Sequence, residues 1–205
     1  MEDRTRHWNH IFAGNEDKEL GWYEGDVSQT LRFLDVIPGG PSGTAFLPGA
    51  GTSLLVEELS ARGMSLVLND ISDEALGRLK GRIGHGGEGL TWICHDISKP
   101  LPTYTPQVDL WVDRAVLHFL LEAADIDGYF RNLRTVLKPG GHVLMAEFSE
   151  DGAPRCAGLN VHRYTVEEMT RRLGPEFTLL KAEEYVFKNP AGSPRPYVYA
   201  LFRRE

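Results

Sequence analysis

Between residues 44 and 148, the sequence alternates short apolar runs typical of strands with runs that have the periodicity of amphipathic helices. Strands separated by helices are connected by crossovers, so this alternation favours a parallel sheet with helices on both faces. The predicted strands are 44–48, 65–69, 89–94, 108–112 and 142–148. The predicted helices are 53–63, 72–83 and about 124–137. An α/β fold is therefore expected.

The C-terminal part departs from this alternation. Thr165, followed three residues later by Glu168, is typical of a capping box that begins a helix. Two strand-like runs follow, at 177–187 and 197–202. The segment between them is rich in turn residues and too short for a helix, so the two runs should pair antiparallel.

Length and composition describe one globular domain. Residues 1–40 are interpreted as an N-terminal helical extension or lid, with a helix near 27–37, and residues 41–205 as the main domain. The net charge of −7 argues against a nucleic-acid partner. No apolar run approaches the roughly 18–20 residues that span a bilayer, and the charged opening has no signal-peptide core. We therefore expect a cytoplasmic protein with no membrane partner.

Two cysteines, Cys94 and Cys156, are too few for a disulfide framework or a four-thiolate zinc site, and no metal is expected.

Gly49-Ala50-Gly51 follows the first predicted strand and precedes a helix that Ser53 could cap. Such a loop offers free N–H groups and the positive end of a helix to an anion, although a tight turn without a ligand is the alternative. The dinucleotide fingerprint has a third glycine where this chain has Leu54, which argues against a pyrophosphate.

Two carboxylates follow the next strands. Asp70 ends the second strand about 20 residues after the glycines, where an acidic residue can accept the hydroxyls of a ribose. Asp96 follows the third strand and could meet an adenine amino group. An adenosine ligand that carries a carboxylate, such as S-adenosylmethionine, fits this set.

The segments GTAFLPGAGTS, LVLND, CHDIS, VDLWVDRAVLHFL and LKPGGHVLMAEF resemble, in order and spacing, the class I S-adenosylmethionine-dependent methyltransferases. The resemblance covers residues 43–150 and departs at Leu47, where the family usually has an acidic residue. It implies a Rossmann-like three-layer sandwich with a seven-stranded, mostly parallel sheet and an antiparallel terminal strand. It also implies S-adenosylmethionine as cofactor and S-adenosylhomocysteine as product. The implied cofactor contacts are Gly49, Ala50 and Gly51 for the methionine portion, Asp70 for the ribose, and Asp96 and Ile97 for the adenine, with Ile71 as a further cofactor-binding residue.

The residues that would serve the acceptor are expected in three places. After the fourth strand, Asp113 is a candidate catalytic and cofactor-contacting residue, with a helix N-cap or an ion pair with Arg114 as the alternative. His118 is a candidate base, against a packing histidine. The predicted substrate-binding residues are Tyr23, Arg114, Arg155 and Arg163, and Tyr164 is a third catalytic candidate. A solvated loop is the alternative for residues 155–165.

Trp8, Trp22 and Tyr23 lie outside the strand–helix units. They could cover the cofactor, with Trp22 close enough to a sulfonium for a cation–π contact. The alternative is that they only cover one end of the sheet.

The N-terminal tryptophans and VDLWVDRAVLHFL resemble the thiopurine methyltransferase-like branch, which modifies small soft nucleophiles. The resemblance therefore implies methyl transfer to a small-molecule acceptor, with a thiol as the leading class. The alternatives are a protein lysine methyltransferase and a non-catalytic protein that binds S-adenosylmethionine. A monomer or weak dimer is expected.

Overall fold

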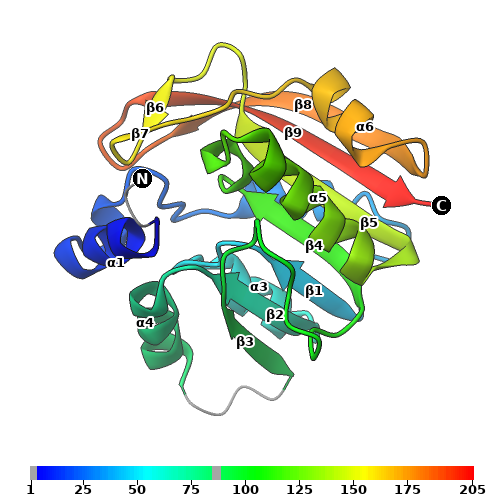
Figure 1. The fold of residues 1–205 in the computed structure, drawn as a ribbon, viewed down its shortest axis with the longest axis horizontal. Coiled ribbons are helices and arrows are strands. Elements are labelled where there is room, and N and C mark those ends of the chain that lie inside the picture. Colours follow the sequence, from blue (N-terminus) through cyan, green and yellow to red (C-terminus); the bar gives the residue numbers. More distant parts are fainter. Residues whose placement is uncertain (1–3, 85–88) are drawn as a thin grey trace.

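The computed structural model describes residues 4–84 and 89–205. Its main feature is a seven-stranded sheet in the order β3-β2-β1-β4-β5-β9-β8 (Figure 1). The strands are β1 (Thr44–Leu47), β2 (Ser65–Asp70), β3 (Leu90–Cys94), β4 (Val108–Arg114), β5 (Leu137–Phe148), β8 (Phe177–Lys188) and β9 (Pro194–Arg204).

The first five strands pair in parallel, and β9 runs antiparallel to both of its neighbours, β5 and β8. The predicted seven-stranded, mostly parallel sheet and the predicted antiparallel pairing of the last two strands are confirmed. The order of the strands reverses at β1, which lies between β2 and β4. Loops that follow β1 and β4 diverge to opposite faces there, and α/β proteins bind ligands at such a point.

Helices cover both faces of the sheet, as the predicted three-layer sandwich requires. Buried side chains of α2 (Ser28–Leu34), α3 (Leu55–Ala61) and α4 (Asp73–Ile83) pack with one face. Those of α5 (Ala123–Val136) and α6 (Val166–Leu173) pack with the other (Figure 1). The remaining elements are α1 (Arg4–Gly14), the short 3-10 helices η1 (Asp17–Glu19) and η2 (Leu117–Phe119), and the hairpin β6 (Arg155–Cys156) and β7 (Leu159–Asn160).

Local sequence explains where α4 and α6 begin. Ser72 caps α4, and its side chain accepts a hydrogen bond from the Ala75 nitrogen at 3.1 Å. Thr165 caps α6 by accepting from the Glu168 nitrogen at 3.2 Å. Ser53 does not cap α3 in the predicted way: the helix begins at Leu55, and the Ser53 hydroxyl accepts from the nitrogen of that residue at 3.2 Å.

Most strands differ from their predicted ranges by one or two residues, and β5 and β9 differ by more. Strand β5 begins at Leu137 because residues 138–141 bulge out of the sheet rather than end the element. Leu137 pairs with Val108, and pairing resumes from His142 to Leu110. Strands β8 and β9 continue into the segment predicted as a turn, which is reduced to residues 189–193. No helix of the described residues combines the length and apolar character needed to cross a membrane.

Candidate cofactor and acceptor site

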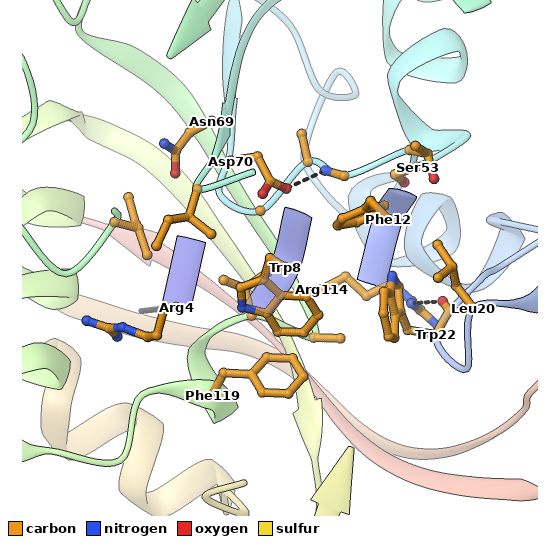
Figure 2. Close-up of a pocket in the computed structure, with 18 of the residues that line it drawn as sticks. Arg4, Trp8, Phe12, Leu20, Trp22, Ser53, Asn69, Asp70, Arg114 and Phe119 are labelled. Carbon is orange, nitrogen blue, oxygen red and sulfur yellow. Dashed lines mark hydrogen bonds between the residues drawn. The ribbon is translucent and has the colours of Figure 1, made fainter. Parts of the chain in front are cut away.

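A cavity lies where the loops after β1, β2, β3 and β4 meet the N-terminal segment (Figure 2). The strand loops contribute residues 49–54, 69–71, 95–97, 114–116 and 119–120 to its lining. The N-terminal segment contributes Arg4, Trp8, Phe12, Leu20, Trp22, Tyr23 and Glu24. All predicted cofactor residues except Asp113 therefore line one cavity, together with the predicted substrate residues Tyr23 and Arg114.

The glycine loop makes close backbone contacts. Gly49 and Gly51 both have a φ of +52°, a region that favours glycine. A Cβ atom on Gly49 would lie 2.4 Å from Cγ2 of Val116, closer than side chains can approach. The nitrogen of Ala50 donates to the Asn69 carbonyl at 2.8 Å, which ties the loop to β2. Gly51 also lines the cavity, and a side chain at this position would project toward Phe12, another lining residue.

Asp70 is held in place by the main chain. Its Oδ2 accepts from the Gly51 nitrogen at 2.8 Å (dashed in Figure 2), and its Oδ1 accepts from the Ser72 nitrogen at 2.8 Å. Burial raises the pKa of this carboxyl to about 6, although these hydrogen bonds oppose the shift. Each carboxylate oxygen can accept a second hydrogen bond, so Asp70 can still receive two hydroxyl groups. This arrangement fits the ribose of S-adenosylmethionine.

Asp96 also lines the cavity, and Arg4 of α1 reaches it. Nη2 of Arg4 lies 2.9 Å from Oδ2 of Asp96, and the same guanidinium contacts Asp125 at 3.1 Å. The Oδ1 atom of Asp96 accepts from the Ser98 nitrogen at 2.9 Å. Arg4 therefore fastens the start of α1 across the loop predicted to contact adenine. The sequence carries no signal for this pair because its members are far apart in the chain.

Aromatic side chains from the N-terminal segment and from η2 cover the glycine loop. The Trp8 ring lies edge-on to those of Trp22 and Phe119, with centroids 5.5 and 4.8 Å apart. Phe12 packs between Trp22 and the loop, with Cζ at 3.4 Å from where a Cβ of Gly51 would lie. Figure 2 shows Trp8 and Phe119 on the same wall. These contacts place the predicted aromatic cover at the cavity, where it can exclude water.

Arg114 was predicted to bind substrate. In the structure its side chain is held by the N-terminal segment Trp22–Glu24. Its Nε forms an ion pair with Oε2 of Glu24 at 2.8 Å, and its Nη1 donates to the Trp22 carbonyl at 2.9 Å (dashed in Figure 2). The guanidinium also lies 4.7 Å from the Phe187 ring and 5.4 Å from that of Tyr197. Burial raises the pKa of Glu24 against the opposing charge of Arg114. Arg114 thus positions the Trp22–Glu24 segment.

Arg114→Met should leave Glu24 buried without its partner and loosen the aromatic cover. Removing one member of a buried ion pair costs about 3–5 kcal/mol, whereas replacing both members by apolar residues is often nearly neutral. We expect the single variant to lose stability in urea and to shift tryptophan emission to longer wavelength. The double variant with Glu24→Leu should recover most of the lost stability. Equal losses in both would contradict this role for the pair.

The three predicted catalytic side chains lie outside the cavity. Asp113, His118 and Tyr164 are each 0 % exposed, so they cannot touch an acceptor. Asp113 accepts from the nitrogens of Val116 and Leu117 at 3.1 and 3.2 Å, so it holds the loop that leads into η2, although the N-cap of that helix is Val116. His118 packs against Phe119 and Phe148, and burial lowers its pKa to about 3. The lining of the cavity therefore gives no support to the predicted catalytic roles of these residues or to the predicted cofactor contact of Asp113.

Arg155 and Arg163 are exposed and also lie outside the cavity. Arg155 donates to the Gly158 carbonyl at 2.7 Å, and Arg163 donates to the Glu150 carbonyl at 2.7 Å. Both therefore support the segment around the β6–β7 hairpin, and neither is placed to hold an acceptor in this cavity. Sequence analysis missed the cavity residues Arg4, Phe12, Glu24 and Phe119, for which only the aromatic spacing of the N-terminal segment offered a signal.

The strand order and the cavity at its reversal define the class of protein: the chain has the Rossmann-like fold of class I methyltransferases. Residues 47–145 match the family model described as "Methyltransferase domain". A search of curated proteins finds no significant match. The domain match, which covers just under half of the chain, and the shared fold support an S-adenosylmethionine-dependent methyltransferase.

Several solved structures share the fold across nearly the whole chain. An N-methyltransferase, NodS, from Bradyrhizobium japonicum in complex with S-adenosylhomocysteine is 19% identical, with a TM-score of 0.73, 98% of this chain covered and 99% of that one. An S-adenosylmethionine-dependent methyltransferase from Anabaena variabilis is 14% identical, with a TM-score of 0.75 and coverages of 98% and 93%. The Burkholderia thailandensis 1,6-didemethyltoxoflavin-N1-methyltransferase is 16% identical, with a TM-score of 0.67 and coverages of 98% and 83%. At these identities the likeness concerns the fold.

Proposed function

We propose that this enzyme methylates a small molecule at a soft nucleophile, with a thiol as the preferred acceptor. The observation that carries the proposal is the cavity itself. It combines the glycine loop, two strand-end carboxylates and an aromatic cover, and its described carboxylates and imidazole already have partners. A thiol needs no further base, because its ordinary pKa near 8.5 leaves a reactive fraction ionised at neutral pH.

The residues proposed to hold the cofactor follow the order of the strands. The backbone of Gly49 to Gly51 would contact the methionine portion, Asp70 and Ile71 the ribose, and Asp96 and Ile97 the adenine. Trp22 would lie on the side of the sulfonium. S-adenosylmethionine supplies an activated methyl group to such a site. The protein then has to align the nucleophile with that methyl and exclude water.

The partners of the cavity residues support an acceptor that arrives ionised. Glu24 is paired with Arg114, Asp96 with Arg4, and Asp70 with two backbone nitrogens. The Nε2 atom of His95 lies 3.0 Å from the Pro100 carbonyl. A protonated amine has to lose a proton before it can be methylated. One of these groups would first have to release its partner in order to accept that proton.

N-methylation is the second candidate, and two observations favour it. Two of the similar structures are N-methyltransferases. Burial also raises the pKa of Glu24, a change that makes this carboxylate a better proton acceptor. The thiopurine methyltransferase-like branch, the boundary at residue 40, and a monomer or weak dimer that binds no nucleic acid remain predictions.

A screen of acceptors tests the proposal. The purified protein, S-adenosylmethionine and a panel of small thiols, selenols, amines and carboxylates are incubated, and S-adenosylhomocysteine release is measured by mass spectrometry. We expect turnover with thiols, absent in Asp70→Ala. Turnover with amines alone would favour the second candidate, and turnover with a protein lysine alone would overturn the small acceptor. Tight binding of S-adenosylhomocysteine without any product would indicate a non-catalytic protein.

A further inference from the structure

Two buried carboxyl groups lie behind the cavity, on neighbouring strands. Asp113 of β4 is in register with Met145 of β5, and Glu147 lies two residues further along. Because side chains alternate along a strand, Asp113 and Glu147 project from the same face of the sheet. Both residues are 0 % exposed. They are close enough for the charge of each to affect the other.

These carboxyl groups hold the segment Ala115–Leu120, which lines the cavity through four of its residues. Asp113 accepts from the nitrogens of Val116 and Leu117, as described above. Oε2 of Glu147 accepts from the His118 nitrogen at 3.2 Å and lies 2.6 Å from Nδ1 of His118. The segment begins at Ala115, whose φ of +68° is unusual for a residue with a side chain. A backbone held in this conformation depends on the groups around it.

The surroundings cannot stabilise two negative charges here. Asp113 also accepts from the Tyr129 hydroxyl at 2.6 Å, so three donors favour its ionised form. Oε1 of Glu147 has no hydrogen-bond partner among the described residues. Two buried carboxylates side by side repel each other, and such pairs retain a proton. The other titratable and charged groups nearby are His118, Tyr164 and Arg114, with Glu168 and Arg172 of α6 beyond Tyr164.

We propose that Asp113 and Glu147 are positioning residues that share one proton and thereby hold Ala115–Leu120 in the conformation that lines the cofactor cavity. In this arrangement the pair carries one negative charge and one proton, and its oxygens accept from the nitrogens of Val116, Leu117 and His118. The segment presents Val116 to Gly49 and Phe119 to Trp8, so its position shapes both the glycine loop and the aromatic cover. The link to cofactor binding rests on the proposed function, whereas the link to the segment does not.

The proton makes the segment sensitive to alkaline pH. Burial raises the pKa of Glu147 to about 8, and burial with the charge of Glu147 raises that of Asp113. A carboxyl whose pKa is raised on folding is protonated in the folded protein and ionised in the unfolded chain between the two values. Its contribution to stability therefore falls as pH rises from about 4.5 to about 8. Above about 8 the second charge forms, and the segment should loosen.

Amide hydrogen exchange of Val116, Leu117 and His118, measured by NMR from pH 6 to 9.5, tests the proposal without cofactor. The wild-type protection factors should fall by up to about tenfold per pH unit above 8, because one proton is lost. Glu147→Gln should keep them flat, since the pair can then no longer form a second charge and the amide oxygen still accepts from His118. Glu183→Gln on β8, at a partly exposed surface carboxylate paired with Arg32, is the matched control and should follow the wild type.

Calorimetry with S-adenosylhomocysteine on the same proteins connects the segment to binding. The wild-type affinity should fall more steeply than that of Glu147→Gln above pH 8, while titration of the ligand itself affects all variants equally. Glu147→Leu, which keeps no acceptor for His118, should bind at least tenfold more weakly at pH 7. Wild-type and Glu147→Gln proteins with the same pH dependence in both measurements would overturn the proposal. Binding absent at every pH, with the exchange pattern intact, would instead count against the proposed function.

Discussion

Asp70→Ala should abolish binding of S-adenosylhomocysteine while the protein remains folded. Among the carboxylates that line the cavity, Asp70 is held by backbone nitrogens, those of Gly51 and Ser72, so it has acceptor capacity left for a ligand. Two hydrogen bonds to a charged acceptor contribute about 3–6 kcal/mol together, so affinity should fall at least about 100-fold. Isothermal calorimetry measures the loss, and urea unfolding reports how far the orphaned Gly51 and Ser72 nitrogens destabilise the fold.

The pH dependence of the wild type provides a second signature. In the free protein the pKa of Asp70 is about 6, and donors from a ribose would lower it. Binding therefore releases a proton below about pH 6, and affinity should decrease as pH falls through that value. Asp70→Asn should bind weakly without this dependence. Asp35→Ala, which removes an exposed carboxylate paired with Arg62, serves as control. Wild-type affinity in Asp70→Ala would remove this site assignment.

Gly49→Ala should both destabilise the protein and weaken cofactor binding by more than tenfold. The residue has a φ of +52°, and its Cβ would overlap Cγ2 of Val116 at 2.4 Å. The conformation costs about 1–2 kcal/mol for a residue with a side chain, and overpacking adds about 1–3 kcal/mol. Either the glycine loop or the segment that carries Val116 must then move, and both line the cavity.

Gly63→Ala separates the two effects. Gly63 has a φ of +79° and nothing within 4 Å of its Cβ position, so it tests the conformational cost alone. Urea unfolding should show a larger loss for Gly49→Ala than for Gly63→Ala, and calorimetry should show weaker binding only for the former. Adding Val116→Ala to Gly49→Ala should restore part of both losses. Equal effects at the two glycines would contradict the close approach to Val116.

Much of the fold was accessible from periodicity. The alternation of strands and helices predicted the parallel part of the sheet, and the absence of a helix between residues 177 and 202 predicted its antiparallel end. Both follow from local patterns, because a strand buried on two faces and an amphipathic helix each have their own spacing. The N-terminal ends of β5 and β9 were predicted less well, since pairing with neighbours extended these strands through proline and glycine.

The sequence by itself determined which backbone segments meet at the cavity, because the carboxyl ends of parallel strands lie along one edge of the sheet. That geometry brought the glycine loop, Asp70 and Asp96 together. Tertiary structure alone decided the direction of individual side chains and their distant partners. Asp113 and Arg114 are consecutive in β4, so they project to opposite faces, one toward Tyr129 in the core and one toward Glu24 at the cavity. Which of them reaches the ligand depends on strand register and packing, and local sequence encodes neither.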